Sequence, residues 1–191
     1  MKTLILSGHN TNDIEKAGEI LRSGGLVAIP TETVYGLAAN ALDGKVVRKI
    51  YEAKGRPSDN PLIVHISEFT QLKPLVREVP ESARKLAAAF WPGPLTIILK
   101  KSELIPEETS GGLDTVAVRF PSHPIARAVI QAAGVPLAAP SANLSGKPSL
   151  TKAKHVVKDM TGRIDAIITA VNVMWVWSRQ SLILQVKSRL Y

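Results

Sequence analysis

Residues 26–33 read Leu26-Val27-Ala28-Ile29-Pro30-Thr31-Glu32-Thr33 and place a short apolar run directly before a polar cluster. A run of this length, bounded by a glycine pair and a proline, is typical of a buried strand. Polar side chains at strand ends are where α/β folds usually build binding sites. The stretch therefore predicts an α/β fold with a site at the strand ends, although a capped turn would explain the polar residues equally well.

Helical and strand patterns alternate on both sides of this segment. Apolar residues at helical spacing predict helices over 13–22, from 43 or 44 onward, over 81–90 and over 123–133. Short apolar runs predict strands over 26–30, 62–66, 95–99, 115–120 and 137–139. The alternation over 191 residues predicts a single α/β domain with a sheet covered by helices, and it leaves parallel and mixed strand orders open.

Composition excludes several classes of protein. The chain has no cysteine, which removes disulfides, thiolate nucleophiles and zinc–thiolate sites, and its four histidines are dispersed without metal-ligand spacing. No apolar run is long enough to cross a bilayer, and Met1 to Asn10 lacks the features of a leader. We expect a cytoplasmic protein with no membrane contact and no metal site of its own.

The net charge of +8 is unevenly distributed. Residues 1–114 carry 14 basic and 14 acidic side chains, whereas residues 115–191 carry 10 basic side chains against Asp159 and Asp165 alone. This asymmetry favours a partner that bears phosphate, either a nucleotide or a nucleic acid, although a basic solvated surface is an equally good explanation.

Three further polar clusters follow predicted helices or strands. Lys54-Gly55-Arg56 forms a cationic fork suited to phosphate oxygens, without the pattern of a Walker A loop. Arg119 ends a strand on which Thr115 and Ala117 share its face, and residues 140–146 form a loop of hydroxyls and amides. A solvated loop, a surface strand and a simple turn are the respective alternatives. Ser141 and Ser145 lack the context of a hydrolase nucleophile.

Taken in order, the clusters resemble the YrdC-like family of threonylcarbamoyl-AMP synthases, in the TsaC-type, short single-domain form. The resemblance spans about residues 10–170 and rests on Pro30 to Leu37, Lys54-x-Arg56 with Asn60-Pro-Leu and His65, Phe90 to Thr96, Thr115 to Pro121, and Ser141 to Gly146. It implies a YrdC-like twisted α/β sheet with flanking helices and a concave basic surface. It also implies a nucleotidyltransferase that joins L-threonine, bicarbonate and ATP into L-threonylcarbamoyladenylate and releases pyrophosphate.

The resemblance also implies roles for individual residues. Lys54 and Arg56 would neutralise the triphosphate of ATP, which Mg²⁺ would accompany. Thr33, His65, Arg119 and the backbone near Ala139 match threonine-binding positions. The ATP-binding positions are matched by Arg56, Asn60, Thr115, Ser141 and Ser149. The product would pass to the machinery that modifies adenosine beside the anticodon of tRNA, with RNA contact as a further expectation.

The resemblance stops after Ile168, and residues 171–191 form a predicted non-family tail beside a YrdC-like domain over 1–170. The missing family segment resembles Gly-Val-Glu-Ser-Thr-Val. The codons of Met174-Trp175-Val176-Trp177 regroup in a neighbouring frame to give Val-Gly followed by Val, Leu or Met, and permitted codons from Ser178 onward allow Glu-Ser-Thr-Val to follow. We interpret the tail as the product of a frameshift. It lacks a serine and an arginine that resemble substrate contacts in the family, which predicts weak or absent activity of this chain.

Two other functions compete with this interpretation. A hydrogenase-maturation carbamoyltransferase would share the chemistry, but the acylphosphatase and zinc-finger segments that accompany it are absent from these 191 residues. A non-catalytic RNA-binding YrdC-like protein would use the basic C-terminal part, although 5% aromatic residues make base stacking a poor mode of binding.

Overall fold

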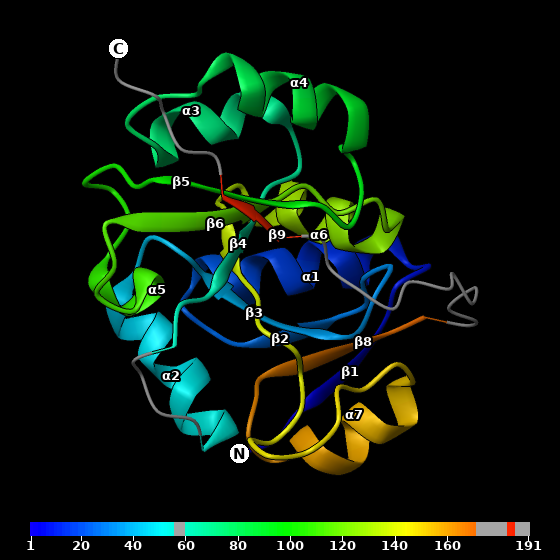
Figure 1. The fold of residues 1–191 in the computed structure, drawn as a ribbon. Helices are drawn as coiled ribbons and strands as arrows, with labels where there is room; N and C mark the ends of the chain where they lie inside the picture. Colours follow the sequence, from blue (N-terminus) through cyan, green and yellow to red (C-terminus); the bar gives the residue numbers. More distant parts are fainter. Residues whose placement is uncertain (56–59, 171–182, 186–191) are drawn as a thin grey trace.

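A computed structural model describes residues 1–55, 60–170 and 183–185. Strands alternate with helices along the chain (Figure 1). The strands are β1 (Leu4–Ser7), β2 (Val27–Ile29), β3 (Gly36–Asn40), β4 (Ile63–His65), β5 (Thr96–Lys100), β6 (Thr115–Arg119), β7 (Leu137–Ala138), β8 (Ala166–Thr169) and β9 (Ile183–Gln185). The helices are α1 (Thr11–Arg22), α2 (Gly44–Lys54), the 3₁₀ turn η1 (Phe69–Gln71), α3 (Leu72–Leu75), α4 (Glu81–Phe90), α5 (Glu107–Ser110), α6 (Pro124–Ala133) and α7 (Ala153–Met160).

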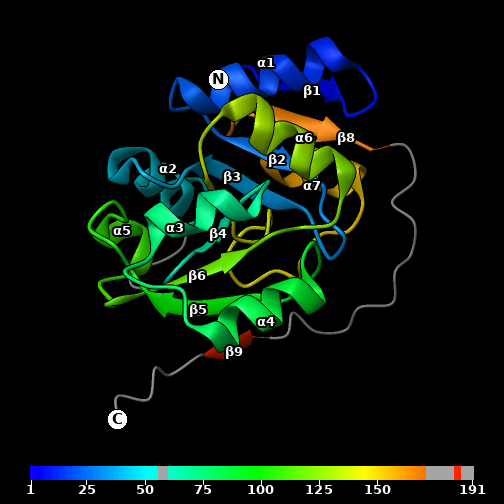
Figure 2. The same cartoon turned by 90° about the horizontal axis from the view of Figure 1, so that it is seen from above.

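The described strands form one mixed sheet in the order β1-β8-β2-β3-β7-β4-β6-β5-β9. Pairs β1–β8, β2–β8, β4–β6 and β5–β9 are parallel, and the other four pairs are antiparallel. Strands β1 and β9 lie at opposite ends of the sheet (Figure 2). The predicted α/β class is therefore confirmed, and the strand order is mixed.

Two apolar cores cover the two faces of the sheet. In β2, Val27 and Ile29 belong to the core shared with α1 and α6, whereas Ala28 belongs to the core shared with α2, α3, α4 and α7. This division follows from the strand period, which points successive side chains to opposite faces. A strand buried on both faces is apolar at every position, which is why its sequence shows no polar alternation.

Helix boundaries follow capping chemistry. Asn10 caps α1 by accepting hydrogen bonds from the backbone N–H groups of Asn12 and Asp13, and Asp43 caps α2 in the same way. Gly55 ends α2 with a φ of 61°, a left-handed conformation that favours glycine. Lys54 is therefore the last residue of α2.

Helices α1 and α6 pack closely at Gly18. A Cβ atom at this position would lie 2.5 Å from the backbone carbonyl carbon of Ala132. We expect Gly18→Ala to lower the free energy of unfolding by about 1–3 kcal/mol, because the two helices must separate to admit the methyl group. Urea unfolding measures this, with Glu15→Ala on the exposed side of the same helix as the control. An unchanged stability of Gly18→Ala would contradict this packing.

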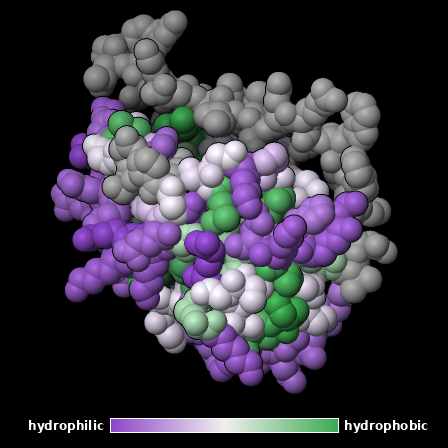
Figure 3. Space-filling model, turned by 90° about the horizontal axis from the view of Figure 1, so that it is seen from below, coloured by the Kyte–Doolittle hydropathy of each residue, from purple (hydrophilic) through white to green (hydrophobic). Residues whose placement is uncertain are grey.

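The end of the molecule that carries α7 is hydrophilic over much of its surface, with scattered apolar groups (Figure 3). Lys152, Lys154 and Lys158 are exposed there. The concave shape expected for the basic surface stays a prediction. No helix in the described ranges is long and apolar enough to span a membrane. In the predicted tail, the structure describes Ile183–Gln185, which adds a strand beside β5; residues 171–182 and 186–191 lie outside the described residues.

Candidate functional site

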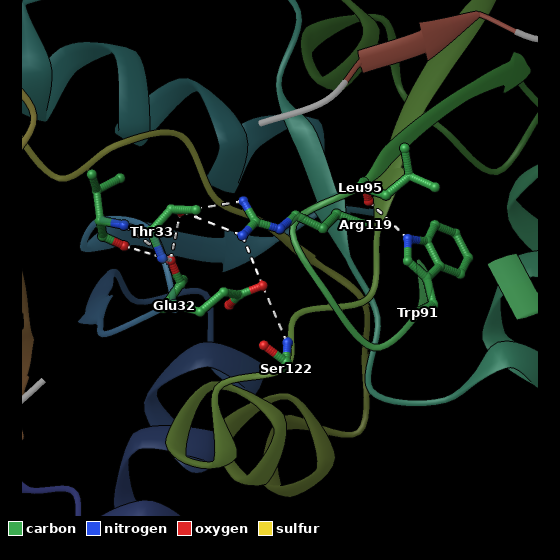
Figure 4. A network of polar contacts seen from close by, with 8 residues as sticks. Glu32, Thr33, Trp91, Leu95, Arg119 and Ser122 are labelled. Carbon is green, nitrogen blue, oxygen red and sulfur yellow. Dashed lines mark hydrogen bonds and ion pairs between the residues drawn. The ribbon is translucent and has the colours of Figure 1, made fainter. Parts of the chain in front are cut away.

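Strand pairing brings the ends of three strands together around Arg119. In the register of the sheet, Arg119 of β6 lies opposite His65 of the parallel strand β4 and opposite Thr96 of the antiparallel strand β5. The connection between β2 and β3 contributes Glu32 and Thr33 to the same place (Figure 4). Three residues predicted at threonine-binding positions, Thr33, His65 and Arg119, therefore lie close together.

The centre of this cluster is a buried ion pair. Nη2 of Arg119 lies 2.8 Å from Oε1 of Glu32, and the two side chains are only 4% and 10% exposed. The backbone N–H of Ser122 donates to the same carboxylate oxygen at 3.2 Å, and both Nη atoms of Arg119 lie 3.4 Å from Oγ1 of Thr33. These contacts fix the guanidinium plane within the site (Figure 4).

The electrostatics keep Glu32 ionised. Burial raises the pKa of the Glu32 carboxyl, but the positive charge of Arg119 and the hydrogen bonds from Arg119 and backbone N–H groups together outweigh it, so the pKa lies below its ordinary 4.5. The site is therefore a compensated pair of opposite charges at neutral pH.

His65 is buried and neutral beside this pair. Burial, and then the charge of Arg119, lower its pKa from 6.5 to about 3. Its Nδ1 lies 3.3 Å from the carbonyl oxygen of Ile63. A neutral imidazole next to a guanidinium can exchange hydrogen bonds with a substrate without adding charge to the site.

The depressed pKa of His65 makes stability depend on pH. Between about 3 and 6.5 the unfolded chain binds one more proton at this residue than the folded chain, so its contribution is complete above 6.5 and is lost as the pH falls. We expect His65→Gln to reduce the slope of unfolding free energy against pH by about 1.4 kcal/mol per unit near pH 5–6. Chemical denaturation at several pH values measures the slope, with exposed His155→Gln as the control. Equal slopes for His65→Gln and the unsubstituted chain would contradict a neutral His65.

A second group of predicted residues surrounds Lys54. This side chain is 3% exposed, and its ammonium donates to the carbonyl oxygen of Ser141 and, at 2.6 Å, to that of Asn143. Ser141 forms a bridge with Gly36, where a Cβ atom would lie 3.3 Å from the Cβ of Ala139. The 140–146 loop is therefore pinned between the start of β3 and the end of α2.

The remaining predicted positions are more widely spread. Thr115 lies at the opposite end of β6 from Arg119, a separation of about 13 Å at the rise of a strand. Asn60 has an exposed side chain, and its carbonyl accepts a hydrogen bond from the Tyr51 hydroxyl at 2.8 Å. Ser149 is exposed, directly before Leu150, whose carbonyl accepts from the N–H of Tyr35. Arg56 lies outside the described residues.

Ala139 contributes backbone rather than a functional side chain. Its N–H donates to the carbonyl of Ile63 at 3.0 Å, two residues before His65. Its methyl group closely approaches Gly36, which follows the polar segment 30–35. Ala139 therefore links β4, near His65, to the start of β3 beside the Ser141 loop.

The structure adds Glu32 and Asn143 to the predicted site. Glu32 is the partner of Arg119, and Asn143 donates from Nδ2 to the carbonyls of Leu144 and Lys147 at 2.9 and 2.7 Å. Both residues stood inside the polar clusters identified in the sequence. A carboxylate in a polar cluster that directly follows a buried strand was the available signal for Glu32.

The fold and this geometry define a mixed α/β protein with a buried charge pair at strand ends. The model of the Sua5–YciO–YrdC family, described as "Telomere recombination", matches residues 19–187. The chain belongs to this family. The matched range extends past residue 170 into the segment predicted as a non-family tail.

Curated threonylcarbamoyl-AMP synthases are similar in sequence. That of Pyrococcus abyssi is 59% identical over 155 residues, which cover 81% of this chain and 46% of the relative. That of Bacillus subtilis is 56% identical over 162 residues, covering 83% of this chain and 47% of the relative. The chain thus spans about half the length of the curated relatives it matches.

Solved structures have the same fold. Pyrococcus abyssi Sua5 complexed with L-threonine superposes with a TM-score of 0.88 at 50% identity, covering 97% of this chain and 54% of that one. Escherichia coli YciO superposes with a TM-score of 0.79 at 22% identity, covering 98% and 90% of the two chains, and shows the fold alone.

Proposed function

We propose that this chain catalyses the formation of L-threonylcarbamoyladenylate from L-threonine, bicarbonate and ATP. The observation that carries the proposal is the buried Arg119, fixed by Glu32 beside Thr33 and His65. Thr33, His65 and Arg119 occupy the positions that the family resemblance assigns to L-threonine. A relative of known structure, 50% identical, binds L-threonine.

The reaction requires positioning more than strong acid–base catalysis. The threonine amine, in its neutral form, and bicarbonate form a carbamate with loss of water, so a C–N bond forms as a C–O bond of bicarbonate breaks. The anionic oxygen of the carbamate then attacks the α-phosphorus of ATP as the bond to pyrophosphate breaks. Because the nucleophile is already anionic, orientation and charge neutralisation supply most of the catalysis. Arg119 would hold the threonine carboxylate, with Thr33, His65 and the Ala139 backbone around the rest of the amino acid.

ATP would lie over the Lys54 group. The ammonium of Lys54 lies against the Ser141 loop, which places positive charge beside Ser141, an expected nucleotide contact. Asn60 would add a second contact. Arg56 would pair with the phosphates, and Thr115 and Ser149 would contact the more distant parts of the nucleotide. Mg²⁺ would arrive with the triphosphate, since no cluster of three His, Asp or Glu in the described part of the chain could hold it.

The cellular setting is part of the proposal. The adenylate would pass to the enzymes that transfer the threonylcarbamoyl group to tRNA, in the cytoplasm.

The non-family tail over 171–191 is proposed as a frameshift product that weakens activity. Regrouping the coding DNA of residues 174–180 tests this directly, because a DNA sequence that cannot encode the family motif in a neighbouring frame overturns the frameshift.

Pyrophosphate release by the purified chain tests the function. With ATP, Mg²⁺, bicarbonate and L-threonine, we expect release that disappears when any one component is omitted, and faster release by a version whose reading frame is restored. Silence of both versions, together with salt-dependent RNA binding, would instead support a non-catalytic RNA-binding protein.

A further inference from the structure

The buried ion pair leaves one charged atom of each sign without a partner. Among the described residues, Oε2 of Glu32 and Nε of Arg119 are buried and accept or donate no hydrogen bond. Buried polar atoms are nearly always partnered, and an unpartnered charged group is the costliest exception. Two such atoms on one ion pair therefore indicate a ligand that supplies both a donor and an acceptor.

Other atoms of the pair already have partners, which limits how the ligand can bind. Oε1 of Glu32 accepts from Arg119 and from the N–H of Ser122, and both Nη atoms of Arg119 lie near Thr33. A ligand with only a carboxylate would approach the negative charge of Glu32, and a ligand with only an ammonium would approach the charge of Arg119. A zwitterion satisfies both atoms at once.

We propose that Glu32 binds the α-ammonium of the amino-acid substrate through Oε2, while Nε of Arg119 donates to its α-carboxylate. The proposal rests on the proposed function, which identifies the amino acid as L-threonine. It makes Glu32 a substrate-binding residue that selects α-amino acids over acids without the amine.

Glu32 binds the amine and does not take its proton. The charge of Arg119, together with hydrogen bonds from its side chain and from backbone N–H groups, keeps the pKa of Glu32 below its ordinary value. The Glu32 carboxylate is therefore a weak base toward an ammonium. His123, with its Nδ1 buried and unpartnered in the described structure, faces the same carboxylate; burial lowers its pKa more than Glu32 raises it. Glu32 is therefore an anion in the ligand-free protein, and the pKa of His123 lies below its ordinary value.

Calorimetric titration with two ligands tests this role. The ligands are L-threonine and (R)-3-hydroxybutyrate, which keeps the carboxylate and hydroxyl but lacks the amine. In Glu32→Gln, which retains a carbonyl oxygen for Arg119 and Ser122, we expect the dissociation constant of L-threonine to rise at least tenfold. We expect the hydroxybutyrate to bind more tightly, because Arg119 is no longer neutralised.

The opposing changes distinguish substrate binding from a structural role. If Glu32→Gln binds L-threonine as tightly as the unsubstituted chain, or if both ligands weaken together, the proposal is overturned. Exposed Glu15→Gln is the control for loss of one carboxylate. The steady-state counterpart is a raised KM for L-threonine with kcat changed by no more than a few fold.

A charge-preserving variant covers the case in which Glu32→Gln does not fold. Glu32→Asp is expected to bind L-threonine less tightly than Glu32 does and still to reject the hydroxybutyrate; loss of that discrimination overturns the proposal. The two proposals fail separately. Binding of L-threonine by the frame-restored chain without pyrophosphate release contradicts the synthase function alone. Equal binding of L-threonine by Glu32→Gln and by the unsubstituted chain contradicts the Glu32 role alone.

Discussion

Replacing Arg119 by methionine is expected to abolish threonine-dependent pyrophosphate release and to lower the free energy of unfolding by about 3–5 kcal/mol. The side chain is 4% exposed and pairs with Glu32 at 2.8 Å. Its loss removes the expected carboxylate contact and leaves a buried, uncompensated anion. Urea unfolding and pyrophosphate release measure the two effects.

A double substitution separates these effects. Glu32→Leu with Arg119→Met removes both charges, so most of the lost stability should return, because a buried pair replaced by apolar residues is often neutral or stabilising. Activity should stay absent. Arg84→Met, at an exposed position of α4, controls for loss of a guanidinium. Threonine-dependent release by a folded Arg119→Met would contradict the assignment of Arg119 to the substrate carboxylate.

Replacing Lys54 by methionine is expected to lower the free energy of unfolding by about 2–4 kcal/mol, since hydrogen bonds from charged groups contribute about 1.5–3 kcal/mol each. The carbonyls of Ser141 and Asn143 lose the ammonium that holds them. Lys54 both holds the 140–146 loop in place and is expected to neutralise the phosphates of ATP. Because its loss removes both effects, kcat/KM for ATP should fall at least a hundredfold.

The control for this prediction lies on the same helix. Lys45 is exposed on the first turn of α2, and Lys45→Met should leave both stability and ATP dependence close to those of the unsubstituted chain. A Lys54→Met variant with unchanged stability would show that the loop is held by other contacts, and unchanged ATP dependence would contradict a role for Lys54 at the nucleotide.

The sequence predicted best the helices whose ends carry local signals. The helix over 13–22 is observed as Thr11–Arg22, extended by the Asn10 cap, and the helix over 81–90 is observed with those bounds. Strand β3 was missed because Gly36-Leu-Ala-Ala-Asn40 lacks β-branched residues. It forms because β2 and β7 pair with it on both sides, which is tertiary context overriding intrinsic preference.

The site was predictable in its members and not in its contacts. Thr33, His65 and Arg119 could be identified from their motifs, and strand pairing brings them together. The partner of Arg119 could not be identified, because the Glu32 contact joins distant segments. Lys54 was predicted as a phosphate ligand from the Lys54-Gly55-Arg56 fork and the family resemblance. The hydrogen bonds that its ammonium donates to the carbonyls of Ser141 and Asn143 carry no sequence signal.

The measurement that tests the synthase proposal most directly is mass spectrometry of the nucleotide products formed from ATP, L-threonine and ¹³C-labelled bicarbonate. The account predicts an adenylate whose mass contains threonine and one labelled carbon, formed by the frame-restored chain and lost in Arg119→Met. If the folded, frame-restored chain yields no labelled adenylate in the presence of all three substrates, the assignment of this site to threonylcarbamoyl-AMP synthesis is wrong.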